Sequence, residues 1–327
     1  SSAGAGFWSA IDWCDQRPST AQIDGGIWFM TLLAAAHQAG WLGQSVDVIV
    51  AWLLANAQGA FDVIKVSVLA VVSFTEMLLE SPPAWLLAWS VAAIGLWRVS
   101  GGFALFVLLG LNLVLSLQLW NEMIATLALV ITASLLALVI GLPLGILSAR
   151  YRSVWRLVRP CLDLMQTMPA FVYLIPAVML FSTGAVPSIL ATLIFSMPPV
   201  VRLTQLGLSQ VPADLIEAGR SFGCSERQLL WKVQMPSALP TVMTGVNQTI
   251  MLALSMVVIA SMIGGGGLGD VVLRGIQQLD VGLGFEGGIA VVILAVILDR
   301  LSQSFTAREV QPLRQRWRAW MSPWRSS

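Results

Sequence analysis

The sequence predicts an all-α integral membrane protein with about seven transmembrane helices, and two observations lead to this fold class. Hydrophobic residues make up 57% of the 327 residues and charged residues only 11%, far from the balance of a soluble domain. The mean hydropathy is correspondingly high, at +0.81. Long uncharged runs also alternate with short polar segments, and about 20 apolar residues suffice to cross a bilayer as a helix.

Charges and glycines divide the apolar runs into spans. Arg98 separates the first two runs, which we expect to form a tight helical hairpin. The glycine- and proline-containing segment 184–187 divides the long uncharged run 163–202 into two helices. The expected spans are 83–97, 102–120, 123–149, the two helices within 163–202, 237–269, and 287–298 extended to include Asp299 and Arg300.

Residues 1–83 are predicted to lie outside the bilayer. Acidic residues outnumber Arg17 and Lys65 in this region, and charges interrupt its apolar stretches. We expect N-terminal amphipathic helices lying along the extracytoplasmic interface, with a true span at 27–42 as the alternative. The expected regions are an N-terminal interfacial region at 1–83, a transmembrane domain at 84–305 and a basic tail at 306–327.

The distribution of arginines predicts the orientation. Arg150, Arg152, Arg156 and Arg159 are interpreted as belonging to one short loop without acidic residues, and the tail 306–327 is also rich in arginine. Positive loops face the cytoplasm. We therefore expect a cytoplasmic C-terminus and an extracytoplasmic N-terminus in a multi-pass protein of the cell (inner or plasma) membrane.

One polar segment, 211–240, interrupts the apolar pattern and is predicted to fold as helix–glycine–helix on the cytoplasmic side. Pro212 suits a first helical position, and Gly223 suits the left-handed position that follows a helix. Ser225 with Gln228 three residues later matches a capping box for a second helix, which we expect Pro236 to end. An ordinary solvated loop is the simpler interpretation of the charges.

The same segment carries a resemblance to a known family. Glu217-Ala218-Gly219, three residues, Gly223, nine residues and then Val233-Gln234-Met235-Pro236 resembles the EAA motif of ABC importer permeases, with Gly219 replacing the second alanine. Runs between about 121 and 303 are similar to the permeases for glycine betaine and proline betaine. The resemblance implies a cytoplasmic coupling helix that docks on a separate ATPase subunit. The coupling residues so implied are Glu217, Ala218, Gly219, Arg220, Gly223, Arg227 and Pro236.

The sequence offers no motif for nucleotide binding, catalysis or metal binding by this chain. A phosphate-binding P-loop requires Gly-Lys-Ser/Thr, and neither Lys65 nor Lys232 follows a glycine. His37 is the single histidine, so no histidine pair is available for a metal, and we expect neither a catalytic residue nor a metal site. With 18 basic and 17 acidic residues, the charge balance does not predict nucleic-acid binding. We expect no cofactor here, ATP and magnesium being bound by the partner ATPase.

Candidate residues for the solute pathway lie in two of the predicted spans. Asn247, Gln248 and Thr249 are polar in an uncharged span, although hydrogen bonding between helices would also explain them. Phe171 and Tyr173 offer aromatic faces for a quaternary ammonium group, although core packing is the simpler explanation. Glycines at 264–267 are consistent with a gate or with a simple turn.

The resemblance implies the permease subunit of an ATP-driven importer for glycine betaine, proline betaine or a related osmolyte. Its implied partners are a second copy of the chain, two cytoplasmic ATPase subunits, an extracytoplasmic solute-binding protein and membrane lipid. The alternative is a secondary carrier or channel that needs no ATPase. Such a carrier is expected to place ionisable residues inside its spans, and these spans have almost none away from their ends.

Overall fold

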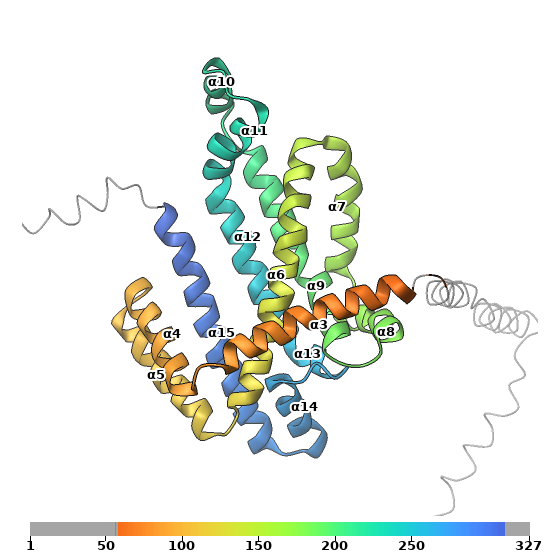
Figure 1. The fold of residues 1–327 in the computed structure, drawn as a ribbon, viewed down its shortest axis with the longest axis vertical. Coiled ribbons are helices and arrows are strands. Elements are labelled where there is room, and N and C mark those ends of the chain that lie inside the picture. The colour runs from red at the N-terminus through yellow and green to blue at the C-terminus, as the bar shows by residue number, and fades with distance from the viewer. Residues whose placement is uncertain (1–55, 57, 311–327) are drawn as a thin grey trace, which may run out of the picture. The chain divides into compact units, whose positions relative to one another are not determined.

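The computed structural model describes residue 56 and residues 58–310, and all regular elements in this range are helices. The chain divides into two compact units, and the account below concerns the second, Gly59–Ser327. The possible span at 27–42 and residues 311–327 of the basic tail lie outside the described residues. In chain order the elements are α3 (Gln58–Glu80), α4 (Ala84–Arg98), α5 (Gly101–Ser116), α6 (Trp120–Arg150), α7 (Arg152–Thr167), α8 (Ala170–Phe181), α9 (Ala185–Ser209), α10 (Ala213–Ser221), α11 (Glu226–Leu229), the π-helical turn η2 (Leu230–Gln234), α12 (Met235–Ser255), α13 (Val257–Ser261), α14 (Leu268–Gln278) and α15 (Val281–Val310) (Figure 1).

Three described helices are long and apolar enough to cross a membrane: α6, α9 and the segment Val281–Ser304 of α15. Helices α7 and α8 meet at a bend of 102°, and counting them as one broken span gives four. Helices α4 and α5 have only 15 and 16 residues. Helix α12 has 21 residues but is less apolar, because Asn247 and Gln248 lie within it. The larger number of spans expected from the sequence stays a prediction.

The last span is longer than the sequence analysis suggested. Helix α15 begins at Val281, before Gly287, and continues past Asp299. The expected division of the run 163–202 is confirmed, because α8 ends at Phe181 and α9 begins at Ala185.

The expectation that four arginines share one short loop is wrong. Arg150 ends α6, and Arg152, Arg156 and Arg159 lie on α7, a regular amphipathic helix. Residues spaced by three or four positions share a helix face, so the spacing of these arginines was itself a helical signal. Arg202 of α9 forms an ion pair with Asp163 and thereby ties α7 to the bundle.

A proline inside a helix removes a backbone hydrogen bond and can break the helix. Among Pro169, Pro176, Pro198 and Pro199, only Pro169 lies at a break, as the N-cap of α8 beside the bend from α7. Pro176 lies within α8, and Pro198 and Pro199 lie within α9, and both helices continue through them. The carbonyl groups that lose a hydrogen-bond donor at these prolines therefore do not mark a broken helix.

Helix α9 packs between α6 and α12 at glycines. A Cβ atom added to Gly141 of α6 would lie 2.5 Å from Val200 Cγ1, and one added to Gly145 would lie 2.9 Å from the Val201 carbonyl oxygen. On the other side, a Cβ on Gly245 of α12 would lie 3.1 Å from Val200 Cα. These distances leave no room for a side chain, so the helix axes approach closely because the glycines have none.

A second cluster joins α4, α5, α13, α14 and α15 to the first half of α6 and the end of α12. The glycine segment before α14 is fixed against α6 rather than loose. Gly267 has φ +71° and lies against Thr126, whose hydroxyl accepts a hydrogen bond of 2.8 Å from the Leu268 amide. Both the positive φ and the contact require glycine, so local packing explains this residue without a gate.

Helix α3 runs across the bundle rather than along it (Figure 1). Val68 and Val72 are buried against residues of α6, α8 and α9. Phe61 meets Phe181 edge-on, with ring centroids 5.5 Å apart. A helix lying across the spans is compatible with the predicted interfacial location, which stays a prediction.

We expect Gly145→Val to destabilise the protein by about 1–3 kcal/mol, because the new side chain must push α9 away from α6. The measurement is thermal unfolding of the purified chain in detergent. Gly288→Val is the matched control, since Gly288 lies within α15 and has no atom within 4 Å of its Cβ position. Equal unfolding temperatures for the two variants would contradict the packing argument.

Candidate functional site

The polar segment between α9 and α12 folds as two short helices joined at a glycine, as the sequence predicts. Pro212 is the N-cap of α10, one residue before the helical position predicted for it. Gly223 has φ +78°, its amide donates to the Arg220 carbonyl at 2.9 Å, and the Cys224 amide donates to the Gly219 carbonyl at 3.1 Å. These two bonds form a Schellman cap, so the predicted left-handed glycine is confirmed.

The predicted capping box at the start of α11 is also confirmed. The Gln228 amide donates to Ser225 Oγ at 3.4 Å, and the Ser225 amide donates to Gln228 Oε1 at 2.9 Å. Both termini at the turn between α10 and α11 are therefore satisfied locally, which stiffens the turn.

The prediction that Pro236 ends the second helix is wrong. Helix α11 passes through the π-helical turn η2 directly into α12, and Pro236 lies in the first turn of α12. A proline is tolerated in a first helical turn, where its missing N–H removes no necessary bond. The loop is consequently continuous, through helical backbone, with the long helix that follows it.

Gly219 is the residue that brings α10 and α11 together. It is buried, and a Cβ added to it would lie 2.7 Å from Leu229 Cδ1 and 3.6 Å from Val233 Cγ2. Leu229 is only 1% exposed. The position at which this chain departs from the EAA pattern therefore faces inward, while Glu217 and Ala218 are exposed.

The outer surface of the segment combines charge with one large apolar side chain. Glu217 and Arg227 are exposed, and Arg220 forms an exposed ion pair of 3.4 Å with Glu226. Phe222, next to Gly223 at the tip, is 89% exposed. Sequence reasoning missed Phe222, although an aromatic residue within a polar, capped segment is a signal for contact with a partner.

An apolar cluster joins the base of the segment to three long helices. Leu208 of α9 and Val211, just after that helix, are buried together with Ala238 and Val242 of α12. Residues of α6 and of the segment itself pack around them, namely Leu142, Ile146, Ala149, Ile216 and Leu230. The base of the segment is therefore in apolar contact with α6, α9 and α12 together.

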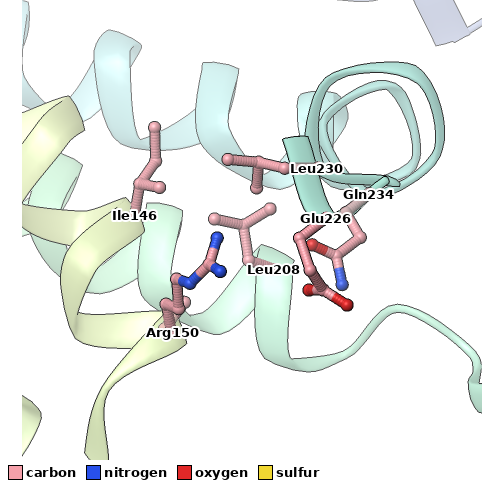
Figure 2. Close-up of a pocket in the computed structure, with 7 residues that line it drawn as sticks. Ile146, Arg150, Leu208, Glu226, Leu230 and Gln234 are labelled. Atoms are coloured by element: carbon pink, nitrogen blue, oxygen red, sulfur yellow. The ribbon is translucent and has the colours of Figure 1, made fainter. Parts of the chain in front are cut away.

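A small pocket of about 110 Å³ lies beside this cluster, between the end of α6, the end of α9, α11 and the turn η2 (Figure 2). Arg150 enters it from α6, and Glu226 and Gln234 lie on its opposite side. Ile146, Leu208 and Leu230 complete its apolar wall. The charged groups next to the base of the segment thus come from two separate elements.

The structure separates the predicted pathway residues. Asn247 and Gln248 line one groove, whereas the neighbouring Thr249 is fully buried. Tyr173 is buried, and its hydroxyl donates to the Met165 carbonyl of α7. Phe171 is 52% exposed. The burial of Tyr173 is explained by its role in holding α8 against α7.

No group of three or more histidine, cysteine or acidic residues that could hold a metal ion occurs within residues 58–310. The segment 211–240 presents exposed charged and aromatic side chains on a capped turn whose base packs against α6, α9 and α12. Comparison with known proteins identifies the family.

Residues 141–309 match the family model described as binding-protein-dependent transport system inner membrane component. The chain belongs to this family. It is 48% identical to the glycine betaine/proline betaine transport system permease protein ProW of Escherichia coli (strain K12), over 88% of this chain and 85% of that protein. It is 47% identical to the glycine betaine transport system permease protein OpuAB of Bacillus subtilis (strain 168), over 82% of this chain and 95% of that protein.

A solved structure is similar to this chain in its fold. A chain of the MetNI methionine ABC transporter, in an inward-facing conformation, matches with a TM-score of 0.53 and 21% identity. The match covers 57% of this chain and 94% of that chain. The family model includes α9, the polar segment, α12 and most of α15, so the segment lies within the family's shared region.

We expect Gly219→Val to separate α10 from α11, because the added methyl groups would overlap Leu229. The measurement is the rate of trypsin cleavage after Arg220 and Arg227, both of which are exposed. Cleavage should become several-fold faster, while Ala218→Val, a change at an exposed neighbouring position, should leave it unchanged. Cleavage of both variants at the wild-type rate would refute the assignment of Gly219 as the contact residue.

Proposed function

We propose that this chain is the permease subunit of an ATP-driven importer that moves glycine betaine, proline betaine or a related quaternary-ammonium osmolyte into the cytoplasm. The observation that carries the proposal is the 48% identity, over 88% of this chain, to a permease named for glycine betaine and proline betaine. A second relative, named for glycine betaine and carnitine, is 47% identical over 83% of this chain. Every one of these names refers to a methylated ammonium solute.

The proposed assembly contains two copies of this chain, two cytoplasmic ATPase subunits and an extracytoplasmic solute-binding protein, surrounded by membrane lipid. The family description, which specifies dependence on a binding protein, supports the last partner. Each ATPase subunit would bind ATP and magnesium and receive one segment 211–240. In this account the chain itself performs no chemistry, and it converts ATPase closure into a change of access.

The docking surface is proposed to consist of Glu217, Ala218 and Phe222, with Arg220 and Arg227 as charged contacts. Glu217 and Ala218 lie on the exposed side of α10, opposite the buried Gly219. A protruding aromatic side chain is the type of residue that anchors interfaces, because it buries a large area at little entropic cost. The apolar cluster at the base of the segment then carries the ATPase movement into α6, α9 and α12.

We propose that the chain crosses the inner or plasma membrane of the cell seven times. Its N-terminus would lie outside the cell membrane and its C-terminus in the cytoplasm. Arg152, Arg156 and Arg159 on α7 support the cytoplasmic assignment of the end that also carries the docking segment. The short helices α4 and α5 are proposed as one hairpin of spans, joined at Arg98.

Reconstitution tests the proposed function directly. The chain, its ATPase and its binding protein are placed in liposomes, and uptake of radiolabelled glycine betaine is followed. We expect uptake to require ATP and all three components. Uptake by this chain alone, without ATP, would instead establish the secondary carrier.

Glu217→Ala should reduce both binding-protein-stimulated ATP hydrolysis and uptake by about tenfold, the effect of losing one central interface contact of about 1.4 kcal/mol. Its control is Asp214→Ala, which removes another exposed acid from the first turn of the same helix. Both variants should insert and purify in wild-type amounts. Wild-type rates in Glu217→Ala would remove this residue from the docking surface.

Phe222→Ala should weaken retention of the ATPase during co-purification, because it removes the proposed aromatic anchor. We expect a loss of about 2 kcal/mol of binding free energy, or about thirtyfold in affinity. Phe285→Ala is the matched control, since Phe285 is 68% exposed but lies near the start of α15. An unchanged ATPase affinity in Phe222→Ala, measured by titration in detergent, would contradict the anchor role.

A further inference from the structure

A groove with a volume of about 540 Å³ lies where α7, α9, α12 and α15 meet. Its polar side chains come from three different helices: Gln166 from α7, Asn247 and Gln248 from α12, and Asp299 and Gln303 from α15. Asp299 is the single charged residue in this lining. The convergence of a carboxylate and four amides from separate helices is typical of a ligand site rather than of a lipid-facing surface.

Apart from Thr244, the remaining wall of the groove is apolar. Pro199 of α9 and Met251 and Leu252 of α12 line it. Methyl groups carried on a charged nitrogen require such a combination, because their surface is apolar while the charge requires a counter-charge. The groove offers both within one volume.

The contacts of Asp299 include an amide donor but no cationic side chain among those described. Its Oδ1 accepts a hydrogen bond of 2.6 Å from Gln303 Nε2, one turn further along α15. Among the side chains described, those of residues 58–304, Asp299 forms no ion pair, in contrast to Asp163 and Asp270, which pair with Arg202 and Arg274. A carboxylate held in place by an amide, without a cation of its own, is suited to receive a cation from outside the chain.

We propose that this groove is a passage site for the transported zwitterion, in which the Asp299 carboxylate faces the methylated ammonium group and the Gln166 and Gln248 amides donate to the solute carboxylate. The inference rests on the proposed function and adds to it a site within this chain. Both glutamines are exposed to the groove and carry N–H donors.

The composition of the groove also predicts weak binding. None of its lining residues is aromatic, so it lacks the cation–π cage that holds quaternary ammonium groups tightly. A site on a transport route must release its solute, and one carboxylate with amides in an open groove meets that requirement. Capture from dilute solution is then left to the binding protein.

The test uses charged thiol reagents as probes of the groove. In the assembled transporter with Cys14, Cys161 and Cys224 changed to serine, Thr244→Cys places one thiol on an exposed position of the groove wall. Its reaction rate is measured with a trimethylammonium-bearing methanethiosulfonate and with a sulfonate-bearing one of similar size. We expect the cationic reagent to be favoured, and excess glycine betaine to slow its reaction.

Asp299→Asn should lower the ratio of cationic to anionic reaction rates by three- to tenfold and should abolish protection by glycine betaine. Asp299→Glu should retain most of the preference for the cationic reagent, because it keeps the negative charge. If Asp299 only held Gln303 by a hydrogen bond, keeping the charge would not by itself preserve this preference. Asp270→Asn, which removes a carboxylate of α14 outside the groove, is the control and should leave the ratio unchanged.

An unchanged ratio in Asp299→Asn, or equal rates for both reagents in the parent, would overturn the passage site. That result would leave the proposed function intact, because ATP-dependent uptake by the wild-type transporter tests it separately. Loss of uptake in the wild type, with the charge preference retained, would instead refute the importer assignment.

Discussion

The close approach of α9 to α6 on one side and to α12 on the other is the contact on which the rest of this structure depends. Inside a membrane, lipid chains are as apolar as leucine, so helices gain little from hydrophobic burial and associate through close packing instead. Gly141 and Gly145 on α6 provide this packing, each with a neighbour under 3.0 Å from an added Cβ, and Gly245 on α12 adds a contact of 3.1 Å. The three helices are therefore held together by complementary packing of their surfaces at these glycines.

This packing anchors both ends of the polar segment 211–240. The segment begins at the end of α9 and runs through η2 into α12, so both of its ends belong to the tightly packed helices. Its tip is stiffened by the glycine cap after α10 and the capping box before α11. The segment therefore leads directly into α12, which also forms one wall of the groove that contains Asp299.

Features set by neighbouring residues could be predicted from the sequence, and features set by distant contacts could not. The left-handed Gly223 and the Ser225–Gln228 box follow from local turn chemistry, so both predictions are confirmed. The helical character of α7 was present in the spacing of its arginines but was interpreted as a loop. The π-helical passage into α12 was not predicted, because a proline such as Pro236 fits both the end of one helix and the first turn of the next.

The candidate site shows the same division. The EAA pattern locates the segment, but it does not reveal that Gly219 faces Leu229 or that Phe222 protrudes. Asn247 and Gln248 were predicted from their polarity and do line a groove, whereas the adjacent Thr249 points into the core. Asp299 joins them through the packing of α15 on α12, a contact between residues far apart in the sequence.

The central claim is that the segment and its three packed helices move as one body, and a distance measurement within one copy tests it most directly. Spin labels are placed at Asp214 on α10 and at Val139 on α6, two exposed positions, and labelled copies are diluted with unlabelled ones. The account predicts the same Asp214–Val139 distance distribution before and after ATP is trapped, while the Asp214–Asp214 distance between two copies changes. A shift or broadening of the distribution within one copy on ATP binding would contradict it.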